Sequence, residues 1–320
     1  MSIGRHVLKL AGYAPALPTP FDEHDRIDTG AFERLCELQI SSGAAALVVG
    51  DTTGEASNLS PAEHCELVRI AAGISRGRVP VIAGAGSNST EHAIELTKDA
   101  EAKGADAILS VVPYYNRPTQ AGLYAHFCEI AASTALPVML YDEPSRTACK
   151  LADATIARLA EVPQIFALKD ASGDPSRVAA LRVLVGPAFR LLSGDDSTAL
   201  SFVAQGGDGC ISVTSNVAPG LCRDMFLALR QGQIARAQRL AHPIAQLTGA
   251  LFCESNPAPV KFALSVFGLV AARVRLPLVE LSQQAKTDVT AVLGRLCNDH
   301  SSSIIGKLGA SISAGRRLAG

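Results

Sequence analysis

One lysine in the sequence stands where it could act as a nucleophile. Lys169 ends the short apolar run Ile165–Lys169, and Pro163 and Gly173 lie on either side of that run. The run is too short for a helix and is typical of a buried strand. Removal from water disfavours a charged amine, so we expect a lowered pKa for Lys169. A neutral amine can form a Schiff base with a carbonyl compound, although a lysine that only ends a strand and reaches solvent would give the same pattern.

The elements that would position this lysine follow a regular alternation. Eight apolar runs recur along the first two-thirds of the chain, and segments with helical periodicity separate them. Runs that are apolar on both faces and alternate with helices are typical of a parallel sheet covered by helices. Eight such units favour an α/β protein with a (β/α)8 TIM barrel over an open sheet. The predicted strands are Ala14–Pro18, Ala45–Gly50, Val79–Ala83, Ala105–Val111, Leu136–Tyr141, Ile165–Lys169, Phe189–Ser193 and Gly209–Val213.

Local signals mark the helices. The segment Ser60–Glu63 is a capping box with proline at the first helical position, and Ser89 or Thr90 can cap the next helix. After the eighth strand the strand pattern ends, and only helical periodicity continues. The predicted helices of this last part are Leu221–Arg230, which completes the barrel, and then Ile234–Phe252, Val260–Phe267 and Leu278–Leu296. We predict a barrel with the catalytic site over residues 1–232, a three-helix C-terminal appendage over 233–298 and a disordered tail over 299–320.

Composition argues against several classes of protein. The chain has 320 residues, is 48% hydrophobic and has a net charge of −1 without a basic block, which argues against a nucleic-acid partner. No apolar stretch is long enough to span a bilayer, and the first ten residues lack the apolar core of a signal peptide, so we expect a cytoplasmic protein. The eight cysteines form no C-x-x-C pair and the seven histidines no H-x-x-x-H pattern, so we expect no metal site.

Polar side chains follow most of the predicted strands. The active site of such a barrel lies at the carboxyl ends of the strands, so these side chains are expected to converge. A tyrosine phenol linked to solvent by hydroxyl groups can carry the protons that Schiff-base formation moves, and an arginine can bind a substrate carboxylate through two contacts. The strand-end residues include Thr19, Asp51, Thr52, Thr53, Tyr114, Tyr115, Tyr141, Arg146, Lys169, Ser193, Gly194, Ser212 and Thr214.

Each of these residues also has a purely structural explanation. Thr52 and Thr53 fit an ordinary turn between a strand and a helix. Tyr114 and Tyr115 fit packing aromatics, and Arg146 fits a surface ion pair that would contribute little to stability. Their coincidence at one face of the barrel, rather than any single residue, favours an active site.

Seven motifs follow one another along residues 12–296. They are Gly50-Asp51-Thr52-Thr53-Gly54-Glu55, Pro113-Tyr114-Tyr115-Asn116-Arg117-Pro118, Tyr141 with Pro144-Ser145-Arg146-Thr147, Leu168-Lys169-Asp170-Ala171-Ser172-Gly173, Leu192-Ser193-Gly194-Asp195-Asp196, Ile211-Ser212-Val213-Thr214-Ser215-Asn216 and Asn256-Pro257-x-Pro259-Val260-Lys261. In this order and spacing, the chain resembles the dihydrodipicolinate synthase and N-acetylneuraminate lyase family.

The resemblance implies roles for four catalytic residues. Lys169 is similar to the lysine that captures pyruvate as a Schiff base, and Tyr141 to the phenol that shuttles protons above it. Thr52 and Tyr115 are similar to the relay partners of that phenol, and Tyr115 is expected to reach in from a neighbouring subunit. No cofactor is implied beyond the covalent link between pyruvate and the lysine.

The resemblance also implies the substrate contacts. Thr53 would hold the pyruvate carboxylate, Ile211 would hold pyruvate through its backbone, and Gly194 would belong to the same substrate-binding set. Arg146 stands where the synthase branch has the arginine that receives the carboxylate of the aldehyde substrate. This arginine favours the synthase branch over the lyase branch.

The implied reaction is a lyase-type condensation of pyruvate with L-aspartate-4-semialdehyde. Its product is 4-hydroxy-tetrahydrodipicolinate, in lysine and diaminopimelate biosynthesis, and the implied assembly is a homotetramer built as a dimer of dimers. One alternative is another pyruvate-dependent Schiff-base aldolase or dehydratase that acts on a sugar acid or keto acid. The other is a non-catalytic paralogue that binds keto acids, and retention of all four catalytic residues argues against it.

Two departures from the family pattern bear on substrate and regulation. The synthases usually have Asn-Val after the tyrosine, whereas this chain has Asp142-Glu143, whose carboxylates could raise the pKa of Tyr141 or repel an anionic substrate. The second departure lies in the family's lysine-inhibition site. His92 stands where regulated members tend to have a glutamate, although His64, Asn88 and Tyr114 match the remainder of that site. We therefore expect weak or absent inhibition by lysine.

Overall fold

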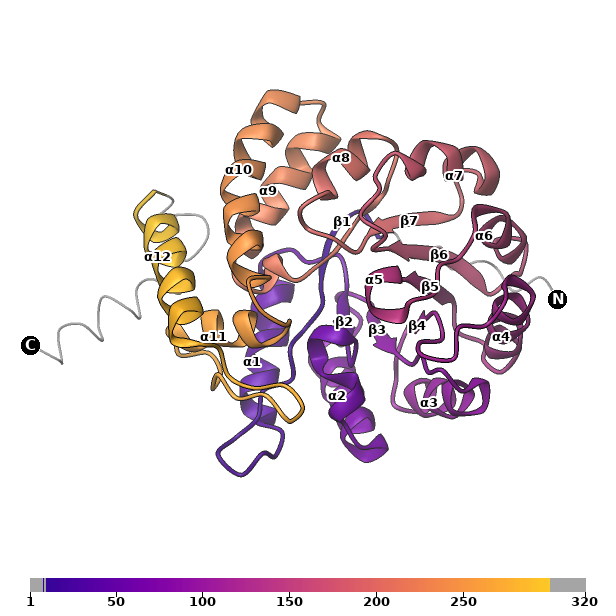
Figure 1. Cartoon of the computed structure of the whole chain (residues 1–320), viewed down its shortest axis with the longest axis horizontal. Coiled ribbons are helices and arrows are strands. Elements are labelled where there is room, and N and C mark those ends of the chain that lie inside the picture. The colour runs from indigo at the N-terminus through magenta and orange to yellow at the C-terminus, as the bar shows by residue number, and fades with distance from the viewer. Residues whose placement is uncertain (1–7, 9, 300–320) are drawn as a thin grey trace, which may run out of the picture.

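The centre of the molecule is a barrel of eight parallel strands (Figure 1), and the computed structural model describes residues 8 and 10–299. The strands pair in the order β1-β8-β7-β6-β5-β4-β3-β2. A bridge between Ala16 and Val48 joins the two ends of this order, so the predicted TIM barrel is confirmed. The strands are β1 (Gly12–Pro15), β2 (Leu47–Val49), β3 (Val81–Gly84), β4 (Ala107–Val111), β5 (Val138–Asp142), β6 (Ile165–Asp170), β7 (Arg190–Ser193) and β8 (Gly209–Ser212), and each overlaps a predicted run.

Helices surround the barrel (Figure 1). The sequence signals for their starts are confirmed, because Ser60 and Glu63 form the capping box of α2 and Ser89 accepts a hydrogen bond from the His92 amide at the start of α3. Short 3₁₀ helices at Thr52–Gly54, Ala56–Asn58 and Thr214–Asn216 follow strand ends. The helices are α1 (Thr29–Ser41), α2 (Pro61–Ser75), α3 (Thr90–Ala102), α4 (Gln120–Ala132), α5 (Pro144–Thr147), α6 (Asp153–Leu159), α7 (Arg177–Val185), α8 (Ala199–Ala204) and α9 (Pro219–Arg230).

Alternation along each strand divides the core into two layers. Leu109, Met139 and Ala167 belong to a cluster that fills the barrel interior. Leu140 and Leu168 belong to the larger cluster that also includes apolar side chains of the surrounding helices. Because successive side chains point to opposite faces of a strand, a residue two positions after an interior residue also faces the interior. This rule places Tyr141 and Lys169 at the carboxyl-end mouth of the barrel.

Three helices extend the barrel at its C-terminal side (Figure 1): α10 (Ile234–Leu251), α11 (Ala258–Val266) and α12 (Gln283–Asp299). The predicted three-helix appendage is confirmed, but the predicted start of the last helix at Leu278 is wrong. Ser282 is the residue that caps α12, because its hydroxyl accepts a hydrogen bond from the Ala285 amide. The proposed domain division stays a prediction, and the tail over residues 300–320 lies outside the described residues.

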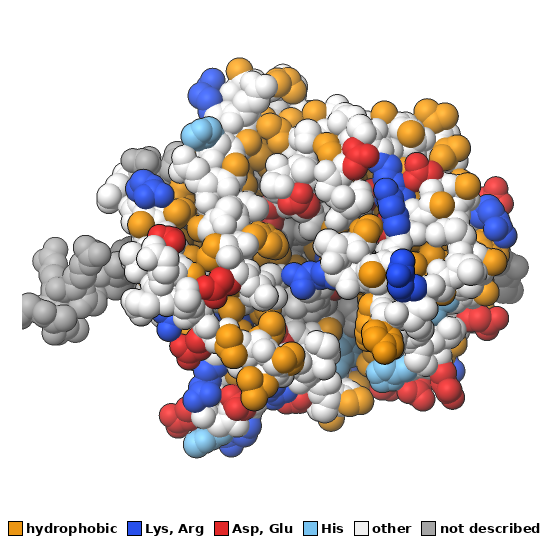
Figure 2. Space-filling model, in the orientation of Figure 1, with side chains coloured by type: hydrophobic (Ala, Val, Ile, Leu, Met, Phe, Trp, Pro, Cys, Tyr) orange, Lys and Arg blue, Asp and Glu red, His pale blue; other side chains and the backbone are white. Residues whose placement is uncertain are grey.

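The described surface carries mixed charge. On the face drawn in Figure 2, acidic and basic side chains are interspersed, and neither sign gathers into one large patch. Among the described residues, no helix is long and apolar enough to cross a membrane.

Candidate active site

Lys169 and Tyr141 face each other because of strand register. They are paired residues on the adjacent parallel strands β6 and β5, and both side chains are directed to the barrel interior. Nζ of Lys169 lies 3.6 Å from the centre of the Tyr141 ring. Each of the two residues is 3% exposed. The structure therefore brings together the predicted nucleophile and the predicted proton carrier.

A carboxylate holds the amine of Lys169. Nζ donates a hydrogen bond to Oδ2 of Asp51 at 2.6 Å, and both side chains are buried. Burial by itself lowers the pKa of Lys169, but the charge of Asp51 and the proximity of Tyr141 outweigh it and raise the pKa above the ordinary value. The sequence-based expectation of a lowered pKa is therefore wrong, because burial alone predicts that direction and the ion partner Asp51 reverses it.

The phenol of Tyr141 is also in contact with a carboxylate. Its hydroxyl donates a hydrogen bond to Oε2 of Glu143 at 3.2 Å. Burial raises the pKa of Tyr141 to about 12, and the charges of Asp51 and Glu143 add to this effect, while Lys169 and the Thr52 hydroxyl oppose it. The expected rise is thus confirmed in direction, but burial is its main cause.

Asp142 has no part in that rise. It lies on the opposite face of β5 from Tyr141 and is fully buried, and its carboxylate accepts a hydrogen bond at 2.9 Å from Nη1 of Arg177. The Leu151 amide donates to its other oxygen. Asp170, the strand partner of Asp142, also lies beside Arg177. The expectation that both carboxylates of the Asp142-Glu143 pair bear on the substrate is therefore wrong for Asp142, which is an ion-pair residue behind the barrel wall.

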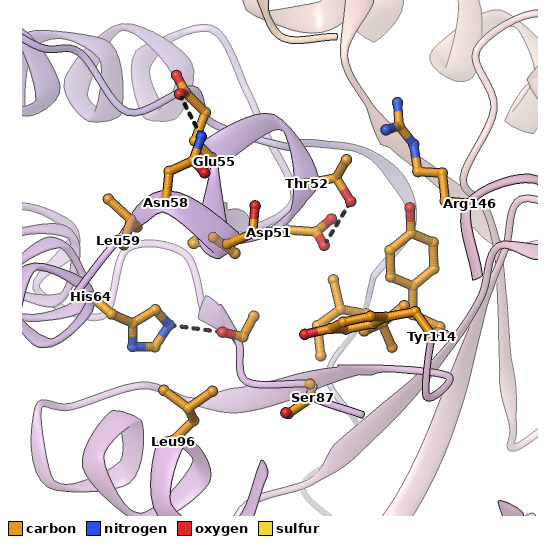
Figure 3. A pocket seen from close by; sticks show the side chains of 18 of the residues that line it. Asp51, Thr52, Glu55, Asn58, Leu59, His64, Ser87, Leu96, Tyr114 and Arg146 are labelled. Atoms are coloured by element: carbon orange, nitrogen blue, oxygen red, sulfur yellow. Dashed lines mark hydrogen bonds between the residues drawn. The ribbon is translucent and has the colours of Figure 1, made fainter. Parts of the chain in front are cut away.

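The two threonines lie in the short 3₁₀ helix after β2. The Thr52 hydroxyl points to Oδ1 of Asp51 at 3.5 Å, as Figure 3 shows. The Thr53 hydroxyl accepts a hydrogen bond at 2.9 Å from the side chain of Asn256, which lies just before α11. The next turn is anchored to the same appendage, because Nζ of Lys261 lies 2.7 Å from a carboxylate oxygen of Glu55 and both side chains are fully buried.

Gly194 and Ile211, the other two predicted substrate-binding residues, lie on the last two strands of the barrel or directly after them. A Cβ at Gly194 would lie 3.1 Å from Cε of Lys169 and 2.8 Å from the Ala171 Cβ, so only glycine leaves room for the lysine stem. Ile211 is buried on β8 and belongs to the barrel-interior cluster. Gly194 therefore lies next to the nucleophile, Ile211 shares the interior cluster with Tyr141, and the substrate contacts of both residues stay a prediction.

A pocket of about 560 Å³ lies next to this group, and its wall includes Asp51 and Tyr141, the two residues that contact Nζ of Lys169. The pocket lining does not include Lys169, Thr53, Gly194 or Ile211. Asp51, Thr52, Tyr114 and Arg146 lie on its wall (Figure 3), together with Tyr141 and Glu143. The pocket continues past His64 and His92 toward α2 and α3. Within the described chain, no group of three or more His, Cys, Asp or Glu side chains is arranged to hold a metal ion.

Tyr115 is the predicted site residue that stands apart. Its side chain is 89% exposed, its φ of 73° lies in the left-handed region, and it is not among the residues that line the pocket. A large exposed aromatic side chain with an unusual backbone conformation is consistent with a contact to a neighbouring molecule. Its entry into another subunit's site stays a prediction.

Comparison with known proteins shows the family of the chain that carries this barrel, lysine and tyrosine. A profile of the Dihydrodipicolinate synthetase family matches residues 9–296. The chain belongs to this family. A 4-hydroxy-tetrahydrodipicolinate synthase of Hyphomonas neptunium is 49% identical to it over 284 residues, which are 88% of this chain and 97% of the relative. The same-named protein of Gluconobacter oxydans is 48% identical over 89% of this chain and 96% of the relative.

Solved structures of dihydrodipicolinate synthases agree in fold over nearly their whole length. The 4-hydroxy-tetrahydrodipicolinate synthase of Methylacidiphilum fumariolicum SolV has a TM-score of 0.88 at 40% identity, over 94% of this chain and 99% of that one. The synthase of Acinetobacter baumannii, described as chloride inhibited and complexed with pyruvate, has a TM-score of 0.87 at 42% identity, over 89% of this chain and 98% of that one.

Sequence reasoning missed three contacts of this family member's site. Asp51 was noted only as part of a strand-end motif, although its position directly before Thr52 could have marked it as a site residue. The sequence predicts an effect of Glu143 on the pKa of Tyr141, but it does not predict the hydrogen bond between the two side chains. Asn256 was noted only as part of a motif, and no local signal indicates that it reaches Thr53 from 203 residues away.

Proposed function

We propose that this chain condenses pyruvate with L-aspartate-4-semialdehyde to 4-hydroxy-tetrahydrodipicolinate, as a lyase of lysine and diaminopimelate biosynthesis. The observation that carries the proposal is the buried Lys169 at the carboxyl end of β6, with Tyr141 beside it. Curated relatives named 4-hydroxy-tetrahydrodipicolinate synthase match almost the full length of their own chains, which supports the same activity here.

In the proposed reaction, Lys169 attacks the C2 carbonyl of pyruvate and forms a Schiff base. The covalent adduct supplies the electron sink, so the proposal needs no metal or organic cofactor. Thr53 would hold the pyruvate carboxylate, with Ile211 and Gly194 beside it. Thr53 lies in the turn after β2, Gly194 next to the Lys169 stem and Ile211 in the interior cluster with Tyr141. A substrate held in this way meets the amine in a fixed orientation, which lowers the entropic part of the barrier.

Tyr141 is the proposed proton carrier at the bound substrate. Its raised pKa keeps the phenol protonated, so it can donate a proton to the aldehyde oxygen when the new carbon–carbon bond forms. The Thr52 hydroxyl lowers the pKa of this phenol by hydrogen bonding, and Thr52 is the proposed next member of the relay. Tyr115 of a neighbouring subunit is proposed to continue it toward solvent.

The second substrate would meet Arg146 and Glu143. Both residues line the pocket, and the guanidinium can bind the carboxylate of L-aspartate-4-semialdehyde through two contacts. A neutralising guanidinium in the same pocket offsets the negative charge of Glu143, so this carboxylate does not exclude an anionic aldehyde.

The proposed assembly is a homotetramer built as a dimer of dimers. The exposure of Tyr115 and its backbone conformation support a neighbouring subunit at that point. The proposed location is the cytoplasm, which agrees with the eight free cysteines, and no nucleic-acid or membrane partner is proposed.

A coupled assay tests the proposed function. Purified protein is mixed with pyruvate, L-aspartate-4-semialdehyde and dihydrodipicolinate reductase, and NADPH oxidation is followed. We expect a rate that Lys169→Ala abolishes and that Lys98→Ala, a change at an exposed lysine on α3, leaves unaltered. Pyruvate trapped at Lys169 by borohydride without turnover of this aldehyde would point to a different aldehyde substrate. Absence of both trapping and turnover would contradict the Schiff-base proposal.

A further inference from the structure

Asp51 presents a carboxylate to the nitrogen that would attack pyruvate. Its Oδ2 lies 2.6 Å from Nζ of Lys169, and the two side chains are only 8% and 4% exposed. Asp51 follows β2 and Lys169 lies at the end of β6, on another side of the barrel and 118 residues away in the chain. The other close neighbour of Nζ is the face of the Tyr141 ring. The barrel mouth therefore holds the amine between a carboxylate and an aromatic ring.

Stability alone gives little reason for a carboxylate at this place. A buried ion pair loses the hydration of both charges and is often no more stable than well-packed apolar side chains. Asp51 also lines the pocket, together with Thr52 and Tyr141. The ion pair thus borders the pocket through Asp51, and it is not enclosed in the core on all sides.

The resting lysine has a proton to lose before it can react. Burial lowers the pKa of Lys169, but Asp51 and Tyr141 raise it above the ordinary value, so the resting side chain is an ammonium. An ammonium has no lone pair with which to attack a carbonyl. Asp51 already accepts a hydrogen bond from this ammonium, so the proton has a short path to a base.

We infer that Asp51 is a further catalytic residue, which takes protons from Nζ of Lys169 and delivers them to the pyruvate oxygen that leaves as water. The inference rests on the proposed function, in which Lys169 forms the Schiff base. Asp51 then handles the protons on the amine, while Tyr141 handles those of the later carbon–carbon bond formation.

The proton and electron movements balance without another reagent. Asp51 takes one proton from the ammonium, and the freed lone pair forms a bond to C2 of pyruvate as the carbonyl electrons move to oxygen. The Asp51 acid protonates that oxygen and gives a carbinolamine. Asp51 then takes a second proton from the nitrogen, whose lone pair expels the hydroxyl, and this hydroxyl leaves with the Asp51 proton as water. The result is a protonated imine beside an Asp51 carboxylate.

Rapid-mix trapping tests the inference on the full-length protein. Pyruvate is added, the reaction is quenched with borohydride after increasing times, and the mass gain of the chain is followed. We expect the rate of imine formation in Asp51→Asn to fall by about 10² or more, the range for loss of a general acid–base group. Asp224→Asn, an equivalent change at a residue that pairs with Arg223 on α9, is the matched control and is expected to keep the native rate.

The outcomes separate this inference from the proposed function. A slow Asp51→Asn with an unreactive Lys169→Ala supports both. A native or faster rate in Asp51→Asn, with Lys169→Ala still unreactive, contradicts the role of Asp51 and leaves the proposed function intact. Absence of trapping in the native protein contradicts both. Asp51→Ala with added formate separates a catalytic role from a structural one, because formate is expected to restore the rate only if a carboxylate is needed as base; failure of formate to do so in a folded variant counts against the inference.

Discussion

At the scale of single residues, two neighbours in the sequence have different tasks because β5 ends between them, with Asp142 as its last residue and Glu143 at the start of α5. Asp142 and Glu143 are adjacent, yet Asp142 pairs with Arg177 behind the barrel wall and Glu143 accepts the hydrogen bond of the Tyr141 phenol. Their identical charge therefore says little about their effect. One carboxylate acts on the stability of the barrel, and the other acts on the active-site pocket.

Asp142→Asn is expected to affect stability and not chemistry. The change removes one charge of a buried ion pair, but Arg177 keeps Asp153 and Asp170 as partners. We expect the free energy of unfolding to fall by about 1 to 3 kcal/mol, less than when a buried charge loses every partner. Denaturant titration measures this loss. The rate at which borohydride traps pyruvate on Lys169 is expected to stay native. A large fall in trapping rate in the folded variant would show that Asp142 acts on the substrate after all.

Gly194→Ala is expected to displace the nucleophile. The added methyl group would lie 2.8 Å from the Ala171 Cβ and 3.1 Å from Cε of Lys169, so the lysine stem must move. We expect turnover to fall by at least about tenfold, because small displacements of reacting groups are costly, and stability to fall by about 1 to 3 kcal/mol. Gly73→Ala is the control, since a Cβ there meets nothing within 4 Å on α2. Equal turnover in the two variants contradicts the packing argument.

The identity of the main site residues could be predicted from the sequence, but their electrostatics could not. Lys169 and Tyr141 end apolar runs, and strand register brings them together without any long-range information beyond the barrel itself. The ion pair of Lys169 with Asp51 depends on how β2 and β6 face each other across the barrel mouth. No local pattern contains that distance, so the predicted pKa shift of Lys169 had the wrong direction.

At the scale of elements, the features that depend on nearby residues were predicted and those that depend on packing were less well placed. All eight strands overlap predicted runs because strands buried on both faces are nearly continuous apolar segments. The capping box at Ser60 is equally local. The start of α12 was placed too early, because its apolar pattern continues upstream of Ser282, the residue that caps it.

A buried histidine between two of these helices is expected to make the folded state less stable in acid. His126 on α4 contacts the Thr90 hydroxyl at the start of α3, and burial lowers its pKa to about 4. The imidazole takes up a proton near pH 6.5 in the unfolded chain but only near pH 4 in the folded chain. The contribution of His126 to stability is therefore fully present above pH 6.5 and is lost as the pH falls toward 4. We expect this group to contribute a loss of roughly 2 to 3 kcal/mol over that window.

His126→Gln is expected to flatten part of this decline, because glutamine can keep a hydrogen bond to Thr90 but does not titrate. Thermal unfolding between pH 7 and 4.5 measures the effect. Burial also lowers the pKa of His64, so His64 contributes to the loss of stability in acid in both the native protein and the His126→Gln variant. His24→Gln, at an exposed side chain, is the control and should follow the native curve. If His126→Gln loses stability as steeply as the native chain, His126 is not the titrating group.

At the scale of the whole molecule, the C-terminal appendage is part of the active-site structure. Asn256 donates to the Thr53 hydroxyl, and Lys261 pairs with Glu55 in a fully buried contact, so residues around α11 hold the turn that follows β2. The same turn carries Thr52 and Asp51. The barrel therefore supplies the nucleophile, and the appendage fixes the turn opposite it.

The exposed Tyr115 predicts that a complete site needs two copies of the chain. Its side chain is 89% exposed and does not line the pocket of its own chain, as expected for a group that completes a neighbour's site. Tyr115→Phe and Lys169→Ala homo-oligomers are each expected to lose most activity. Co-refolded mixtures should regain up to about a quarter of native turnover, because random pairing makes half of the dimers mixed and each mixed dimer has one site with both native residues. A Lys169→Ala/Tyr115→Phe double variant mixed with Lys169→Ala is the control and should stay inactive. If the first mixture also stays inactive although mass spectrometry detects mixed dimers, Tyr115 does not act across the subunit interface.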